Sequence, residues 1–259
     1  MSNKMVIYTK SEGVATIKLN SPKTMNALTG DLVDELKVAI QDAATDESIG
    51  AVILTGTDKA FCAGGDLQRL SQGFTPVEAF EYLKGFTWVS DLVNMEKPVI
   101  AAVNGFAVGA GFTLAMMCDL VMASQNAKFG LAFVNVGLVP DLGASYFLTR
   151  TLGLHRTKEL AFTGRNMDAD EAYRIGVATM VVPPESLEEE ALKLAKKLAN
   201  GPRVAIRTGK RLINRAVDLG FEELLDLEAF SQAQCFQTED SKIAMEAFFN
   251  KTKPVFKGK

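Results

Sequence analysis

At its centre the chain reads KPVIAAVNGFAVGAG, residues 97–111, a short apolar run that leads directly into a glycine-rich loop. The apolar part, Val99–Val103, is too short and too rich in β-branched residues for a buried helix. Two similar runs, Ala51–Thr55 and Asp119–Ala123, lie on either side of it, and helical or glycine-rich segments separate the three. This alternation is typical of a parallel α/β sheet that is buried on both faces.

Other elements follow from the same patterns on both sides of this centre. Met5–Thr9 and Val14–Asn20 are expected to form a strand pair, and Asp31–Ala44 an amphipathic helix. A capping box at 186–189 predicts a helix that ends at residues 200–202, before further helices over 203–218, 221–236 and 239–250. We therefore expect an α/β core over residues 1–200 and a helical region over residues 201–259.

Composition excludes several classes of protein. The chain has 259 residues, of which 47% are hydrophobic and 23% charged, and 28 basic against 31 acidic residues give a net charge of −3. No basic stripe suited to nucleic acid or to an anionic membrane is present in the sequence. Three widely spaced cysteines and one histidine argue against a disulfide framework or a zinc site, so we expect no metal. The N-terminus resembles no secretory or transit signal, which favours the cytoplasm.

Two loops after the apolar runs have very small residues at their centres, residues 57–66 and 104–111. Ligands of open parallel sheets bind beyond the carboxyl ends of the strands, where such loops let a substrate approach the backbone. Two N–H groups from separate loops can stabilise the oxygen of a thioester enolate, and we predict Ala63 and Ala110 as these donors. The alternative is that the small residues serve only tight packing. Neither loop matches a nucleotide-binding glycine motif.

A third loop, Gly137–Gly143, carries Asp141 just before an expected helix over residues 144–152. The apolar residues upstream, Phe129, Leu131, Phe133 and Val134, are expected to keep water from the carboxylate. Asp141 could then serve as a general base, because partial burial raises the pKa of a carboxyl group. The alternative is that Asp141 only caps the helix.

Taken together, several motifs resemble the enoyl-CoA hydratase/isomerase (crotonase) family over nearly the whole chain. They are FCAGGD at 61–66, the central segment 97–111, Cys118-Asp119, SPKTMNAL at 21–28 and FFNKTKPVF at 248–256. The resemblance implies a spiral of ββα units and a helical C-terminal region that forms trimers, often paired into hexamers. It also implies an acyl-CoA substrate whose thioester oxygen lies between two backbone amides, which fall on Ala63 and Ala110. Coenzyme A enters as part of the substrate, so no separate cofactor is expected.

The chain departs from the family's hydratases at two positions. By resemblance their catalytic glutamates fall on Thr113 and Phe133, whereas Asp141 falls where some family isomerases keep an aspartate. One carboxylate suits a 1,3-proton shift, so we predict double-bond isomerisation with Asp141 as the proton shuttle. The alternatives are a single-carboxylate hydratase and a protein that binds acyl-CoA or a partner without turnover. Hydrolytic dehalogenation would also need a histidine, and we interpret His155 as structural.

The remaining site predictions rest on the same resemblance. Lys23, Ala27 and Lys253 are expected to bind the coenzyme A part, the last from an adjacent subunit, although solvated surface charge is an equal alternative for the lysines. The residues expected to line the substrate pocket are Gly64, Asp66, Leu67, Phe106, Gly109, Thr113 and Phe133. Aromatic residues between the two small-residue loops, Phe74, Phe80, Phe86 and Trp88, are expected to contribute to the acyl pocket or to the core.

Overall fold

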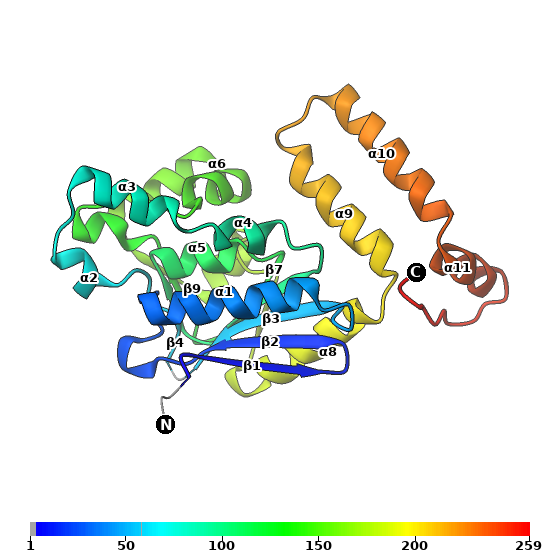
Figure 1. Ribbon diagram of the computed structural model, residues 1–259, viewed down its shortest axis with the longest axis horizontal. Helices are drawn as coiled ribbons and strands as arrows, with labels where there is room; N and C mark the ends of the chain where they lie inside the picture. Colours follow the sequence, from blue (N-terminus) through cyan, green and yellow to red (C-terminus); the bar gives the residue numbers. More distant parts are fainter. Residues whose placement is uncertain (1–3, 58) are drawn as a thin grey trace.

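The computed structural model describes residues 4–57 and 59–259, which build two sheets, surrounding helices and a helical arm (Figure 1). The six-stranded sheet has the order β1-β2-β3-β5-β7-β10, and the four-stranded sheet the order β4-β6-β8-β9. Strands of the first sheet are β1 (Val6–Ser11), β2 (Val14–Leu19), β3 (Ala51–Gly56), β5 (Val99–Val103), β7 (Leu120–Ser124) and β10 (Met180–Val182). Those of the second are β4 (Ala60–Cys62), β6 (Phe106–Val108), β8 (Lys128–Gly130) and β9 (Asn166–Asp168).

The chain winds between the two sheets as a spiral. Each of the three central strands β3, β5 and β7 is followed by a short strand of the other sheet, and then by helix. The pairings β3–β5, β5–β7, β4–β6 and β6–β8 are all parallel, whereas the β1–β2 and β8–β9 pairings are antiparallel. This confirms the predicted fold class and the three apolar runs as its central strands.

Helices cover both faces of the six-stranded sheet. Helix α1 (Gly30–Thr45) buries Leu32, Leu36 and Ile40 in the main core, and α8 (Leu187–Ala199) closes a second apolar cluster with Ala191 and Ala195. The other helices of the core are α2 (Leu67–Ser71), α3 (Pro76–Lys84), α4 (Trp88–Val93), α5 (Ala110–Met116), α6 (Ala144–Thr163) and α7 (Ala169–Arg174), with 3-10 turns at Pro22–Thr24, Ala132–Val136 and Pro184–Ser186.

One detail of the predicted helices is wrong and another is confirmed. Ser186 makes no side-chain capping bond to α8, because it ends the 3-10 turn Pro184–Ser186 and has helical backbone angles, so the predicted capping box is absent. The helix predicted over residues 144–152 is confirmed: α6 (Ala144–Thr163) consists of two helical segments separated by a kink at Gly153, whose φ of 74° is outside the helical region. A glycine adopts that angle without the strain that a side chain would add.

Three C-terminal helices form an arm that extends from the core (Figure 1). They are α9 (Arg203–Ala216), α10 (Phe221–Phe236) and α11 (Glu239–Phe249), close to the expected ranges. The arm exposes large apolar side chains, among them Phe221, Phe248 and Phe249. Dividing the chain at residue 200 remains a prediction. Across the described residues, no helix is long and apolar enough to cross a bilayer.

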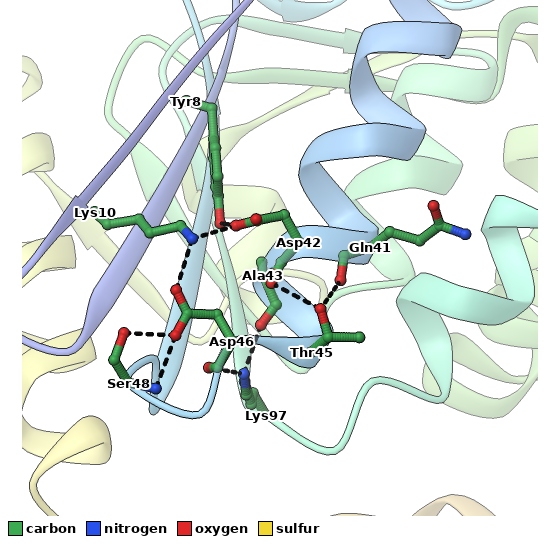
Figure 2. Close-up of polar contacts among 9 residues, drawn as sticks. All are labelled: Tyr8, Lys10, Gln41, Asp42, Ala43, Thr45, Asp46, Ser48 and Lys97. Atoms are coloured by element: carbon green, nitrogen blue, oxygen red, sulfur yellow. Dashed lines mark hydrogen bonds and ion pairs between the residues drawn. The ribbon is translucent and has the colours of Figure 1, made fainter.

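Polar side chains fix the C-terminal end of α1 against β1 and the segment just before β5 (Figure 2). The Tyr8 hydroxyl donates to Asp42 at 2.7 Å, and Lys10 pairs with both Asp42 and Asp46. The Lys97 ammonium donates to the carbonyl oxygens of Ala43 and Asp46, each at 2.6 Å, and its burial lowers its pKa. Lys97 thus satisfies carbonyl groups that the helix end leaves without intrahelical partners.

Candidate active site

The two small-residue loops lie directly against each other. A Cβ atom placed on Gly111 would lie 1.9 Å from the carbonyl oxygen of Cys62, so no side chain fits there. A Cβ atom on Gly64 would lie 2.7 Å from the carbonyl oxygen of Val108 and 3.4 Å from the Ala110 nitrogen. Gly64 also has a φ of +106°, which side chains rarely adopt. The loops therefore meet through their backbones, next to the Ala110 amide.

Ala110 is the first residue of α5, and its amide stands at the helix N-terminus. Its N–H lacks a hydrogen-bond acceptor among residues 4–57 and 59–259, as is usual for the first turn of a helix. Gly109 precedes it with a φ of 55° and makes no capping bond. The helix dipole adds partial positive charge at this point. The geometry is that of an anion-stabilising amide, and its use with substrate remains a prediction.

The amide of the other predicted donor, Ala63, is hydrogen-bonded within the chain, and its use with substrate stays a prediction. Its N–H donates to the carbonyl oxygen of Met25 at 3.0 Å and is therefore occupied. The next amide, that of Gly64, is directed to the Cys62 sulfur. The Gly65 N–H, by contrast, has no acceptor in the described part of the chain. The sequence analysis did not consider the Gly65 amide, whose use with substrate is likewise a proposal.

Asn26 attaches the turn at 21–28 to the first loop. Its side chain is fully buried, accepts from the Ser21 N–H at 2.7 Å and donates to the Ala60 carbonyl oxygen at 2.7 Å. The Leu28 N–H also donates to the Gly64 carbonyl oxygen, at 2.8 Å. Asn26 was not singled out from the sequence, because its role appears only once residues 34 positions apart come together.

Asp141 has the surroundings expected of a proton-transfer group. Its Oδ1 atom is buried without a hydrogen-bond partner in the described residues, and burial raises its pKa to about 6. A hydrogen bond from its own backbone N–H lowers the pKa by a smaller amount. Helix α6 is capped by Gly143 and receives no side-chain capping bond, so the alternative of Asp141 as a cap is wrong. Apart from the bond to its own backbone N–H, no hydrogen bond to the Asp141 carboxylate is present within the described residues.

The apolar residues upstream of Asp141 divide into two groups. Phe129, Leu131 and Phe133 are buried, as predicted. The prediction for Val134 is wrong, because 42% of its surface is exposed and it is not part of the buried group that would keep water from the carboxylate in this protomer.

The structure brings several predicted pocket residues together. Thr113 is fully buried and its hydroxyl donates to the Gly109 carbonyl oxygen at 3.4 Å, while the Phe133 ring lies 4.0 Å from a Cβ atom placed on Gly109. Neither residue can supply a carboxylate.

Other predicted pocket residues lie at the edge of this group. Asp66 caps α2, accepting from the Arg69 N–H at 3.1 Å, whereas Leu67 and Phe106 are exposed. Phe80 is exposed as well, and Trp88 belongs to the core.

The predicted coenzyme A contacts are split between two parts of the chain. Lys23 is exposed in the turn at 22–24, and Ala27 is half-buried beside it, next to the first loop. Lys253 is exposed. The C-terminal tail that carries it follows α11 at the end of the arm, whereas the first loop begins at β4 in the core (Figure 1). One protomer does not bring Lys253 to this site, and its contribution from an adjacent subunit stays a prediction.

Within the part of the chain that is described, no group of three or more histidine, cysteine or acidic side chains is arranged to hold a metal.

Comparisons with known proteins were made for the sequence and for the fold. Residues 9–259 match the family model described as enoyl-CoA hydratase/isomerase. The chain is 40% identical over 259 residues to a probable enoyl-CoA hydratase of Rhizobium meliloti and 39% identical over 258 residues to a crotonyl-CoA hydratase of Syntrophomonas wolfei, covering 99% of each chain in both cases. The crystal structure of an enoyl-CoA hydratase subunit from Geobacillus kaustophilus superposes with a TM-score of 0.94 at 38% identity, covering 98% of both chains.

Proposed function

Because the chain belongs to the enoyl-CoA hydratase/isomerase family, whose members act on acyl-CoA thioesters, we propose that it transforms an enoyl-CoA with Asp141 as its acid–base residue. The observation that carries this proposal is the buried, unpartnered Oδ1 atom of Asp141, with a pKa raised to about 6. A carboxylate with such a pKa is ionised near neutral pH and still basic enough to accept a proton from a substrate carbon.

The geometry best supports migration of a double bond. Asp141 removes a proton from the α-carbon of a 3-enoyl-CoA, and the electron pair moves to the thioester oxygen to give a dienolate. The amides of Gly65 and Ala110 stabilise this oxygen, since both N–H groups are free and the two loops that carry them touch. Asp141 then returns the proton to the γ-carbon, which yields a 2-enoyl-CoA. One carboxylate completes this cycle.

Hydration of a 2-enoyl-CoA is the second candidate, and the relatives favour it. The curated relatives reported above carry hydratase names, and the comparisons support hydration better than the isomerisation predicted from the sequence. In hydration Asp141 would accept a proton from the attacking water. The difficulty is that Thr113 and Phe133 provide no second carboxylate.

Turnover of 3-enoyl-CoA and 2-enoyl-CoA, measured side by side, tests the proposal. Asp141→Asn is expected to lower the turnover of whichever substrate the parent uses by about 10²-fold or more. Asp168→Asn serves as the matched control, because Asp168 caps the short helix α7, is not among the residues assigned to the site, and asparagine also caps well. An unchanged rate for Asp141→Asn would remove this residue from the mechanism.

We also propose that the arm mediates self-association into a trimer or a dimer of trimers. Its exposed phenylalanines, Phe221, Phe230, Phe248 and Phe249, form more apolar surface than a solvated helix hairpin usually carries. Light scattering of the purified chain tests this: a trimer or hexamer is expected, and a monomer at micromolar concentration would contradict it.

A further inference from the structure

The loop that carries Asp141 enters α6 through an unusual backbone conformation. Leu142 has a φ of 52°, which places a leucine in the left-handed region that residues other than glycine rarely adopt. Such a conformation persists only where the surrounding structure holds it. Here the first turn of α6 holds it, because the Ala144 N–H donates to the Asp141 carbonyl oxygen at 2.9 Å. The position of Asp141 therefore depends on where α6 lies.

The first part of α6, residues 144–152, is fixed on two opposite sides. The kink described above separates it from the rest of the helix. On one side Ala144 and Leu148 are fully buried in the main core. Tyr146 and Arg150 lie on the other side, since positions four apart share a helix face and positions two apart do not. This second side contacts the arm.

Tyr146 and Arg150 meet one carboxylate of the arm, that of Asp218, in the turn between α9 and α10. The Tyr146 hydroxyl donates to Asp218 Oδ2 at 2.8 Å, and the Arg150 guanidinium donates to Asp218 Oδ1 at 2.8 Å. The guanidinium carbon also lies 3.5 Å from the centroid of the Tyr146 ring. The bonds from Tyr146 and Arg150 lower the pKa of the Asp218 carboxyl, so it is ionised at neutral pH. Both carboxylate oxygens thus take part in one clamp between the arm and α6.

This clamp is the specific polar connection between the two elements. Among the described residues, the hydrogen bonds between α6 and the arm are those that end on Asp218. A cavity of about 380 Å³ is lined by Phe147 of α6 and Ile213 of α9, among others. Because a cavity rather than close packing separates these side chains, the position of α6 relative to α9 depends on Asp218.

Helix α9 is itself fixed to the sheet. The Lys210 ammonium, on a side chain that is 9% exposed, donates to Asp119 at 2.7 Å and to the Lys97 carbonyl oxygen at 3.1 Å. The Asp119 carboxylate also accepts from the Val99 N–H, at the start of β5, at 2.7 Å. The end of α9 that carries Asp218 therefore has a fixed base on the sheet, from which it can hold α6.

We propose that Asp218 is a positioning residue for Asp141: from the turn of the arm it holds the first part of α6, which in turn holds the loop of the acid–base residue. The inference rests on the proposed function, since it assigns a support to the carboxylate of that function. A misplacement of about 1 Å can lower a rate about 10²-fold, so a contact away from the chemistry can control it. The arm thus serves the site in addition to its proposed role in self-association.

The test measures kcat and KM of Asp218→Asn, Tyr146→Phe and the double variant with the enoyl-CoA that the parent turns over. Asparagine keeps the size of the side chain but offers Arg150 no charge. We expect Asp218→Asn to lower kcat about tenfold and to change KM by less than about twofold, because the two small-residue loops are left intact. Tyr146→Phe should lower kcat by less, because Arg150 still binds the carboxylate. The double variant should lose no more than Asp218→Asn alone, since the residues act as one clamp.

Glu190→Gln is the matched control. Glu190 makes a surface ion pair with Lys193 on α8, at 3.2 Å, so this variant loses an exposed ion pair that involves neither α6 nor the arm. Its kcat should equal that of the parent. Light scattering of Asp218→Asn should show the oligomeric state of the parent. Its thermal unfolding should lie within about 4 °C of the parent, since an exposed ion pair contributes little to stability.

Each other result overturns the role of Asp218. Unchanged kcat of Asp218→Asn, a rise in KM alone, additive losses in the double variant, or an equal loss in Glu190→Gln would do so. A changed oligomeric state or a larger fall in unfolding temperature would do so as well, because the loss would then belong to assembly or to the fold. Asp141→Asn, assayed beside these variants, keeps the two proposals apart. If it is inactive while Asp218→Asn is fully active, only the positioning role fails, and if it keeps full activity, the proposed function fails.

Discussion

Replacing Asp141 by asparagine should stabilise the protein while it removes the acid–base group. Burial raises the pKa of this carboxyl from 3.8 to about 6. Above that pH the carboxyl is ionised in the folded protein, and this buried charge lowers the free energy of unfolding. The unfolded chain exposes the carboxyl and has no such cost. Asparagine has the same shape and no charge to desolvate. The variant should therefore show its full gain in stability above about pH 6, and the gain should shrink as the pH falls from 6 to 3.8 and vanish only near pH 3, where the parent carboxyl is neutral in both states.

The size of the effect follows from the shift. A rise of about two pKa units corresponds to roughly 3 kcal/mol if the group is fully desolvated. Asp141 is only partly buried, so solvent screening reduces the expected gain to about 1–2 kcal/mol. For a chain of this length, 1 kcal/mol moves Tm by about 2–4 °C.

Thermal or urea unfolding at pH 8 and at pH 4.5 provides the assay, with Asp66→Asn as the carboxyl-to-amide control. The difference in unfolding free energy between Asp141→Asn and the parent should be largest at pH 8 and fall to about a third of that value at pH 4.5, whereas the control should show no such change with pH. Destabilisation at pH 8 would mean that the Asp141 carboxylate makes a favourable structural interaction, and the reasoning about its burial would be wrong.

Two further substitutions test how the site is supported. Lys97→Met keeps the apolar stem of the side chain but removes the ammonium group that donates to the carbonyl oxygens of Ala43 and Asp46. Chemical denaturation should show that the free energy of unfolding falls by about 1–3 kcal/mol. A change below about 0.5 kcal/mol would contradict the role of Lys97 at the end of α1. Gly111→Ala would place a methyl group 1.9 Å from the Cys62 carbonyl oxygen and force the two loops apart. Turnover should therefore fall by more than about tenfold even where circular dichroism shows a folded chain. Full activity would show that the loops need not touch.

The sequence predicts the central architecture because local patterns encode it. The β-branched runs at 51–55, 99–103 and 119–123 became β3, β5 and β7, and the helical period of 31–44 became α1. Hydrophobic periodicity reflects which face is buried, and burial decides these elements. The capping box predicted at Ser186 does not form, because Ser186 is the last residue of the 3-10 turn that begins at Pro184.

The sequence predicts where the site lies, but only part of the groups that form it. Small residues in the two loops and a carboxylate before α6 indicated where the backbone is accessible and where a base stands. The Ala63 N–H donates to the carbonyl oxygen of Met25, a contact across 38 positions that no local pattern contains.

The most direct test of the account is the pH dependence of kcat/KM for the parent enzyme with its best enoyl-CoA substrate. If ionised Asp141 with a pKa of about 6 is the base, kcat/KM should be level above pH 7 and fall below it, to about one tenth of the plateau at pH 5. Circular dichroism at pH 5 must show a folded chain. A rate that stays at the plateau down to pH 5, as an aspartate with a pKa of 3.8 would give, contradicts the claim that a buried Asp141 carries the proton.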